Sequence, residues 1–107
     1  MKTYRVTISD EALEGVERYL DYIEEQSGTS RVAARWWEKA LAGIFSLETM
    51  PHRCPLAPED EFAERTIRVL IVDKFLFLYT IDEEDSVVRV LDCRHGSQQP
   101  RQMNEPE

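Results

Sequence analysis

The sequence predicts an α+β domain in which a helical hairpin packs on one face of a largely antiparallel four-stranded sheet. Three observations lead to this prediction. Apolar and polar residues alternate at 3–9, two amphipathic helical patterns follow between 10 and 50, and three segments rich in β-branched and aromatic residues occupy 65–95. The predicted element order is β-α-α-β-β-β, and 107 residues suffice for one such core.

The segment TYRVTIS at 3–9 places an apolar side chain at every second position, which predicts a strand with one buried face. Ser9 follows as a helix N-cap, and the acidic residues of the next turn suit the positive end of a helix dipole. An amphipathic helix is then predicted by the apolar stripe Ala12, Leu13, Val16, Tyr19, Leu20 and Ile23.

A second helix is predicted after a short connection. Gly28 is a typical helix stop, and Thr29 or Ser30 can cap the next helix, which should run to Pro51 and form a tight antiparallel hairpin with the first. Its apolar residues at helical spacing are Ala33, Trp36, Trp37, Ala40, Leu41, Ile44, Phe45 and Leu47. The adjacent tryptophans point about 100° apart, so one should pack on the sheet and the other reach the rim.

The segment at 51–64 contains three prolines and a run of acids, which predicts a surface loop. The three strands RTIRVLIV, KFLFLYTID and SVVRVLDCRH should follow. KFLFLYTID is apolar on both faces and should be central, whereas neither alternating set of the last strand is clean enough to identify its buried face. We expect residues 1–96 to form the domain and the polar residues 97–107 to be a mobile tail.

Acidic residues dominate the composition, with 21 Asp plus Glu against 13 Lys plus Arg and a formal net charge of −8. This charge opposes non-specific attraction to nucleic acid, so a nucleic-acid function would need a local basic face. The longest apolar run is far short of the ~20 residues that span a bilayer, and no signal peptide is visible, so we expect a cytoplasmic protein that does not bind membranes. The two cysteines should be free thiols.

Three motifs in this order carry a resemblance: CPLAPE at 54–59, IRVLIVDKFLFLYTID at 67–82 and VVRVLDCRHG at 87–96. Together with the element order, they resemble the RelE/ParE superfamily of toxins from type II toxin-antitoxin modules, often called plasmid stabilisation proteins. The resemblance implies a small poison, without a cofactor, that a cognate antitoxin holds inactive in a hetero-oligomer. RelE-like members cleave messenger RNA on the ribosome without a metal, and ParE-like members inhibit DNA gyrase, so the shared fold alone does not identify the target.

Cleavage of RNA without a metal needs a base for the 2′-hydroxyl proton, cationic groups for the charge on phosphate, and an acid for the leaving oxygen. His95 is the candidate base or acid, because its unperturbed pKa lies near neutrality. The other candidates are Arg68 and Arg94 as phosphate-binding groups, Tyr79 or Glu59 as an auxiliary proton-transfer group, and Lys74 as a further cation.

Each candidate also has an ordinary structural explanation. A histidine that precedes a glycine at a strand end, as His95 does, is more often a hydrogen-bonding residue than a catalyst. Arg68 and Arg94 could equally be solvated strand residues that pair with the acidic loop at 59–64. A zinc site in which His52-Arg53-Cys54 meets Cys93-Arg94-His95 is a further alternative, but its ligand spacing is not that of common zinc motifs, and we expect no metal.

Two departures weigh against the nuclease. Leu76 stands where the family nucleases tend to carry a basic residue, and those nucleases are usually basic overall. We therefore favour a ParE-like toxin that inhibits gyrase by binding and is not an enzyme. A RelE-like endoribonuclease and a non-toxic relative that keeps the fold and antitoxin binding remain alternatives. The excess of acids further predicts an antitoxin segment that is less acidic than usual.

Overall fold

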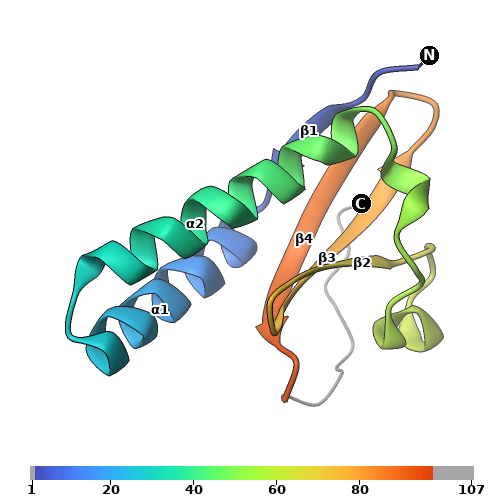
Figure 1. The fold of residues 1–107 in the computed structure, drawn as a ribbon. Helices are drawn as coiled ribbons and strands as arrows, with labels where there is room; N and C mark the ends of the chain where they lie inside the picture. Colours follow the sequence, from blue (N-terminus) through green and yellow to red (C-terminus); the bar gives the residue numbers. More distant parts are fainter. Residues whose placement is uncertain (1, 98–107) are drawn as a thin grey trace.

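The computed structural model describes residues 2–97. They form a four-stranded sheet and two helices in the predicted order, so the predicted fold class is confirmed (Figure 1). The elements are β1 (Arg5–Ile8), α1 (Asp10–Ser27), α2 (Ser30–Phe45), β2 (Arg68–Val72), β3 (Phe75–Asp82) and β4 (Val87–His95). Three short 3₁₀ turns, Ser46–Glu48, Pro51–Arg53 and Pro58–Phe62, connect α2 to β2. Of the predicted tail, residues 98–107 lie outside the described part.

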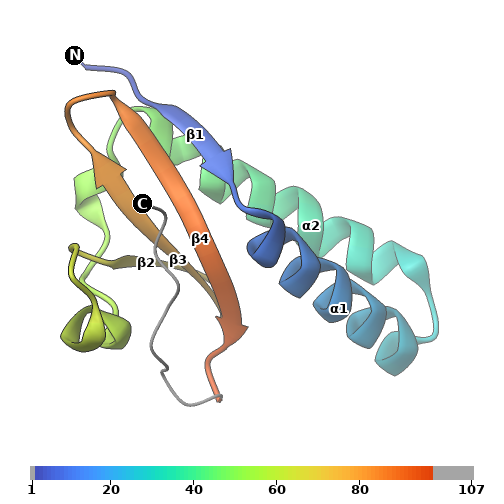
Figure 2. The same ribbon diagram turned by 180° about the vertical axis from the view of Figure 1, so that it is seen from behind.

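The strands lie in the order β1-β4-β3-β2. β2, β3 and β4 pair antiparallel as a meander, whereas β1 runs parallel to β4 at the edge of the sheet (Figure 2). The central position predicted for β3 is confirmed. The first strand of the chain and the last are therefore hydrogen-bonded neighbours, with Arg5 opposite Val87.

Local hydrogen bonds fix the start of both helices and the end of α1 where the sequence predicts. The Ser9 hydroxyl accepts the Ala12 N–H at 3.1 Å and donates to the Leu91 carbonyl at 2.7 Å, which ties the start of α1 to β4. Gly28 ends α1 in the left-handed conformation, at φ 73°, and Thr29 caps α2. α2 is shorter than predicted and ends at Phe45. The hydroxyl of Ser46 bonds to the Gly43 carbonyl, a local contact that competes with continued helix.

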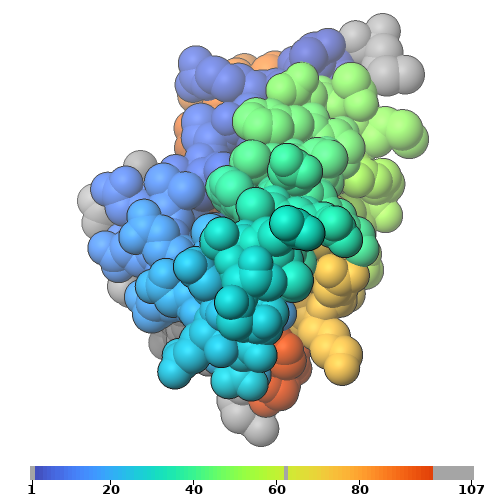
Figure 3. All heavy atoms as spheres, turned by 60° about the vertical axis from the view of Figure 1, so that its left-hand side comes forward, coloured from blue at the N-terminus to red at the C-terminus, as the bar shows by residue number. Residues whose placement is uncertain are grey.

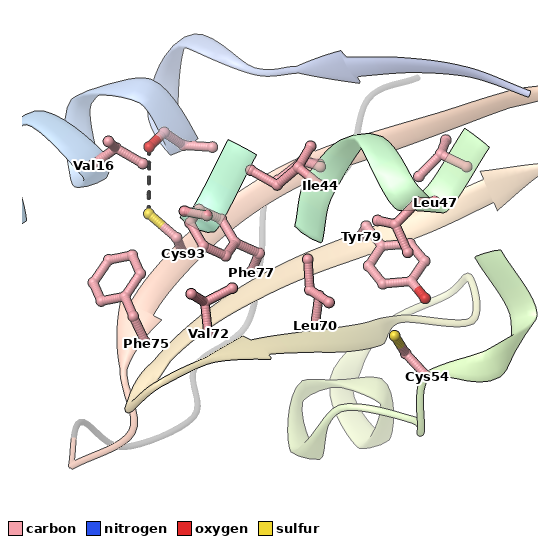
Figure 4. Packing of buried hydrophobic residues seen from close by; sticks show 14 of the residues in the cluster. Val16, Ile44, Leu47, Cys54, Leu70, Val72, Phe75, Phe77, Tyr79 and Cys93 are labelled. Carbon is pink, nitrogen blue, oxygen red and sulfur yellow. Dashed lines mark hydrogen bonds between the residues drawn. The ribbon is translucent and has the colours of Figure 1, made fainter. Parts of the chain in front are cut away.

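The main core lies between the helices and one face of the sheet, which α1 and α2 cover side by side (Figure 3). Trp36 is buried and stacks near Phe77, while Trp37 is half-buried at the rim, as the adjacent tryptophans predict. Figure 4 shows how apolar side chains from α1, α2 and the strands meet in this layer. Its fully buried aromatic members include Phe77 and Tyr79.

The second face of the sheet is less open than the sequence suggests, because the segment at 55–67 folds back over it. The Ala57 N–H donates to the Ile67 carbonyl at 2.8 Å and the Val69 N–H to the Pro55 carbonyl at 3.0 Å. A smaller apolar cluster lies beneath, made of Ala57, Ile67, Val69, Leu78 and Leu91. The predicted surface loop is thus a cover with an apolar underside.

The alternation of β4 is irregular because the strand contains a bulge. The register passes from Leu78 opposite Asp92 to Tyr79 opposite Val90, so Leu91 is the extra residue. Val90 and Cys93 consequently both face the helices, while Leu91 joins the cluster on the second face. The bulge is the physical reason that neither alternating set in the sequence identifies the buried face.

Replacing Ser86 with glycine should stabilise the domain. Ser86 lies in the β3–β4 turn at φ 56°, a conformation that costs a residue with a Cβ about 1–2 kcal/mol. Glycine adopts this conformation without strain, but it also raises the conformational entropy of the unfolded chain, which offsets part of the benefit. We therefore expect the free energy of unfolding, measured in urea, to rise by about 0.5–1 kcal/mol. Ser86→Ala is the matched control and should give no gain. Equal stability of both variants would contradict the prediction.

Candidate functional site

The candidate residues named from the sequence do not form one site. Arg68 lies opposite Tyr79 across β2 and β3, whereas His95 lies opposite Phe75 at the far end of β3. Tyr79 and Phe75 are about four residues apart on the strand, roughly 13 Å at ~3.3 Å per residue. Arg68 and Tyr79 are therefore separated from His95 by much of the length of β3.

Tyr79 is enclosed in the main core. Its hydroxyl donates to the Pro51 carbonyl at 2.5 Å, and burial, aided by a hydrogen bond to Cys54, raises the pKa of Tyr79 far above that of an exposed tyrosine. Its neighbour Arg68 is partly exposed and donates to the Cys54 carbonyl at 2.6 Å. Both side chains thus anchor the 51–54 segment to the sheet.

Arg94 forms an ion pair inside the protein. Its Nε lies 2.6 Å from one Glu59 oxygen and its Nη2 3.2 Å from the other, and the two side chains are only 3% and 0% exposed. Arg94 thus pairs with the acidic loop, as the alternative to catalysis has it, but the pair is buried rather than solvated. The sequence also offered Glu59 as a proton-transfer group, but in the structure its carboxylate binds a guanidinium.

His95 emerges on the helix side of the sheet, next to Tyr19 and Phe75. Its Nδ1 accepts the Ser97 N–H at 3.1 Å and lies 2.8 Å from the Ser97 hydroxyl oxygen. The opposite directions of Arg94 and His95 follow from their adjacency on a strand. Lys74 is exposed in the β2–β3 turn, where its carbonyl accepts the Gly96 N–H at 2.7 Å.

A hollow of about 380 Å³ lies between α1 and the end of β4, and we call it the α1–β4 hollow. Gly15 and Cys93 form part of its lining, and an added Cβ on Gly15 would lie only 2.6 Å from the Cys93 sulfur. Stacked aromatic rings form one wall. The lining residues are Gly15, Arg18, Tyr19, Tyr22, Phe75, Cys93, Arg94, His95 and Ser97. No sequence pattern marks this hollow, because the spacing of its aromatic residues is also that of ordinary core residues.

A larger polar hollow of about 590 Å³ lies at the other end of the sheet. Its lining carries both signs of charge, with His52, Arg65 and Arg68 among the basic groups and Asp82, Glu83 and Glu84 among the acids. This mixture gives it no strong preference for an anion or a cation. No sequence pattern marks this hollow either, since its walls come from segments that are far apart in the sequence.

Glu83 organises the rim of this polar hollow. Its carboxylate accepts the Tyr4 hydroxyl at 2.8 Å and the Lys2 ammonium at 3.1 Å, and it lies 2.5 Å from the His52 Nε2. The hydrogen bond from Tyr4, followed by that from Lys2, lowers the pKa of Glu83. The network ties the N-terminal strand and the 51–54 segment to the β3–β4 turn.

The structure does not bring the two cysteine-histidine tripeptides together. Cys54 lies near Tyr79, whereas Cys93 lies near the start of β3 and donates to the Ala12 carbonyl at 3.3 Å (Figure 4). Within residues 2–97, no three histidine, cysteine, aspartate or glutamate side chains are grouped so that they could hold a metal ion. Nor does this part of the chain contain a helix with the length and apolar character needed to cross a membrane.

Comparisons with known proteins place this geometry in context. A family model described as the ParE toxin of the type II toxin-antitoxin system parDE matches residues 6–100. The fold resembles that of a chain in the toxin-antitoxin complex RelBE2 from Mycobacterium tuberculosis, with a TM-score of 0.57 and 22% identity over 87% of this chain and 98% of that chain.

A second similar fold occurs in the archaeal RelE-RelB complex from Pyrococcus horikoshii OT3. The TM-score is 0.57 at 14% identity, over 91% of this chain and 99% of that chain. At such identities the likeness establishes the fold alone. No curated protein matches the chain in sequence.

Proposed function

Because the chain belongs to the ParE toxin family and is the toxin of a type II toxin-antitoxin module, we propose that it arrests growth by binding DNA gyrase in the cytoplasm rather than by cutting RNA. A cognate antitoxin would hold it inactive. The observation that carries this proposal is the dispersal of the candidate catalytic residues: within residues 2–97, Arg68, Tyr79, Arg94 and His95 do not face one common point, as cleavage of a phosphodiester would require.

A general base must lie about 2.6–3.2 Å from the atom that carries the proton it removes, with cationic groups facing the same phosphate. Here the Arg94 charge is balanced by Glu59, and His95 points to the opposite side of the sheet. The Tyr79 hydroxyl is directed into the core and stays protonated at neutral pH, since burial raises its pKa. The net charge of −8 also opposes attraction to RNA.

The test compares the two targets directly. The purified chain should inhibit supercoiling of a plasmid by gyrase at concentrations that leave messenger RNA intact in a ribosomal translation assay. Induced alone in a bacterial host, it should slow growth, and co-expression of the antitoxin of its module should restore growth. Rapid cleavage of messenger RNA at specific ribosomal positions would overturn the proposal, as would normal growth at high soluble expression.

The substitution Tyr79→Phe further distinguishes RNA cleavage from inhibition by binding, because it removes only the hydroxyl. A nuclease that used this group for proton transfer would lose roughly 10²-fold or more in rate. A toxin that acts by binding should keep its growth arrest, with a stability loss of only about 1 kcal/mol from the missing hydrogen bond to Pro51.

A further inference from the structure

The α1–β4 hollow lies where Gly15 lets α1 approach Cys93 closely. Its size of about 380 Å³ falls within the range of sites that enclose a side chain or a small ligand. Tyr19 stacks on the buried Phe75 with ring centroids 4.3 Å apart, and Tyr22 stacks on Tyr19 at 6.0 Å. The outermost ring, Tyr22, is 54% exposed, so this aromatic wall runs from the core to the surface.

This lining is chemically suited to a large apolar side chain. An aromatic residue buries 150–250 Å² and gains further from offset or edge contacts with other rings. The guanidinium of Arg18 at the rim can contact the face of such a ring, and His95 adds a polar edge. Sites of this kind, with an aromatic anchor enclosed by a rim, carry much of the energy in protein interfaces.

The surroundings of the hollow are acidic. Glu11, Glu14, Asp21 and Glu25 are exposed on α1 within one helical turn of the lining residues. With a net charge of −8, this surface repels a phosphate backbone and attracts lysine and arginine. The lining itself carries Arg18 and His95, but the exposed acids around it favour a protein segment with basic residues over a nucleic acid.

We propose that the α1–β4 hollow is an anchor site for the antitoxin, which inserts one aromatic side chain flanked by basic residues. This inference rests on the proposed role of the chain as a toxin held by an antitoxin. It specifies where on this surface the partner docks and which residues of the partner recognise it. The Phe45 ring on α2, 50% exposed, offers an unrelated apolar position for comparison.

The first experiment titrates the full chain with three blocked tripeptides, Lys-Trp-Lys, Glu-Trp-Glu and Lys-Ala-Lys, and follows the backbone amide signals of Gly15, Tyr22 and Ser97 by NMR. Lys-Trp-Lys should shift these signals saturably, at least fivefold more tightly than Glu-Trp-Glu, and Lys-Ala-Lys should not saturate. Raising the salt concentration should narrow the difference between the two tryptophan peptides. Equal affinity of the two, or no saturable shift by either, would overturn the proposal.

Tyr22→Ala is the informative variant, because Tyr22 is largely exposed and its loss leaves the core intact. This substitution should weaken the affinity for Lys-Trp-Lys, and for the antitoxin of the same module, by tenfold or more. Phe45→Ala should change each of these two affinities by less than twofold. Equal effects of the two substitutions would place the anchor elsewhere. None of these measurements needs growth arrest or gyrase, so their failure is distinguishable from that of the proposed function.

Discussion

Replacing Arg94 with methionine is expected to lower the free energy of unfolding by about 3–5 kcal/mol, the largest loss that we anticipate from a single substitution. The reason is that the Glu59 carboxylate is fully enclosed and would lose the guanidinium that pairs with it, so a buried acidic group would be left without its partner. The total free energy of unfolding of a domain of this size is about 5–15 kcal/mol, so the variant would be marginally stable. Urea unfolding followed by the fluorescence of the buried Trp36 measures the loss.

The double variant Glu59→Met/Arg94→Met is the control. Apolar side chains of similar length remove both charges together, so most of the stability should return, to within about 1 kcal/mol of the original protein. A loss below 1 kcal/mol for Arg94→Met would mean that water reaches the pair. A double variant no more stable than the single one would mean that the two side chains also have separate partners whose loss matters.

Replacing Gly15 with alanine should destabilise the domain by about 1–3 kcal/mol, although alanine normally favours a helix over glycine by about 1 kcal/mol. The new Cβ would lie 2.6 Å from the Cys93 sulfur, which is buried and bonded to the Ala12 carbonyl. Either the Cys93 side chain must rotate and lose its hydrogen bond to the Ala12 carbonyl, or α1 and β4 must move apart. Thermal or urea unfolding should show the loss directly.

Two comparisons isolate the cause. Gly43→Ala in α2 meets Leu70 and Val72 only at 3.4 and 3.6 Å, so it should be neutral or gain up to about 1 kcal/mol from helix propensity. Cys93→Ala removes the obstructing sulfur, and Gly15→Ala should do far less harm in that background. Additive losses in the double variant would contradict a clash between these two side chains.

The sequence predicts the parts of the fold that depend on neighbouring residues. The Ser9 cap and the Gly28 stop rest on local backbone chemistry, and the central place of β3 rests on its apolar residues on both faces; each matches the structure. The end of α2 was misjudged, because the residues after Phe45 keep helical spacing while the chain tightens into a 3₁₀ turn. Leu47 remains buried even so, since the turn still packs on the core.

The parts that sequence reasoning missed depend on distant residues. The extra residue Leu91 in β4 switches the side chains that follow it to the other face of the sheet. Only the pairing of β4 with β3 reveals this bulge. Arg94 is a catalytic candidate in the sequence with pairing to the acidic loop as an alternative, and nothing there singles out Glu59 among the acids of that loop or shows that the pair is buried. The α1–β4 hollow likewise needs the close approach of Gly15 to Cys93, which no periodicity encodes.

The parallel pairing of β1 with β4 has a consequence for the synthesis of this toxin. Arg5 leaves the ribosome long before its partner Val87, and about 80 residues of translation, roughly 4–16 s at bacterial rates, separate them. During that interval the edge strand has no neighbour and the inner faces of α1 and α2 have no sheet to cover. A polypeptide interrupted before β4 lacks the strand that joins both halves of the sheet. The toxin can therefore complete its sheet only after β4 has been translated, and a product terminated before β4 has no complete fold with which to act.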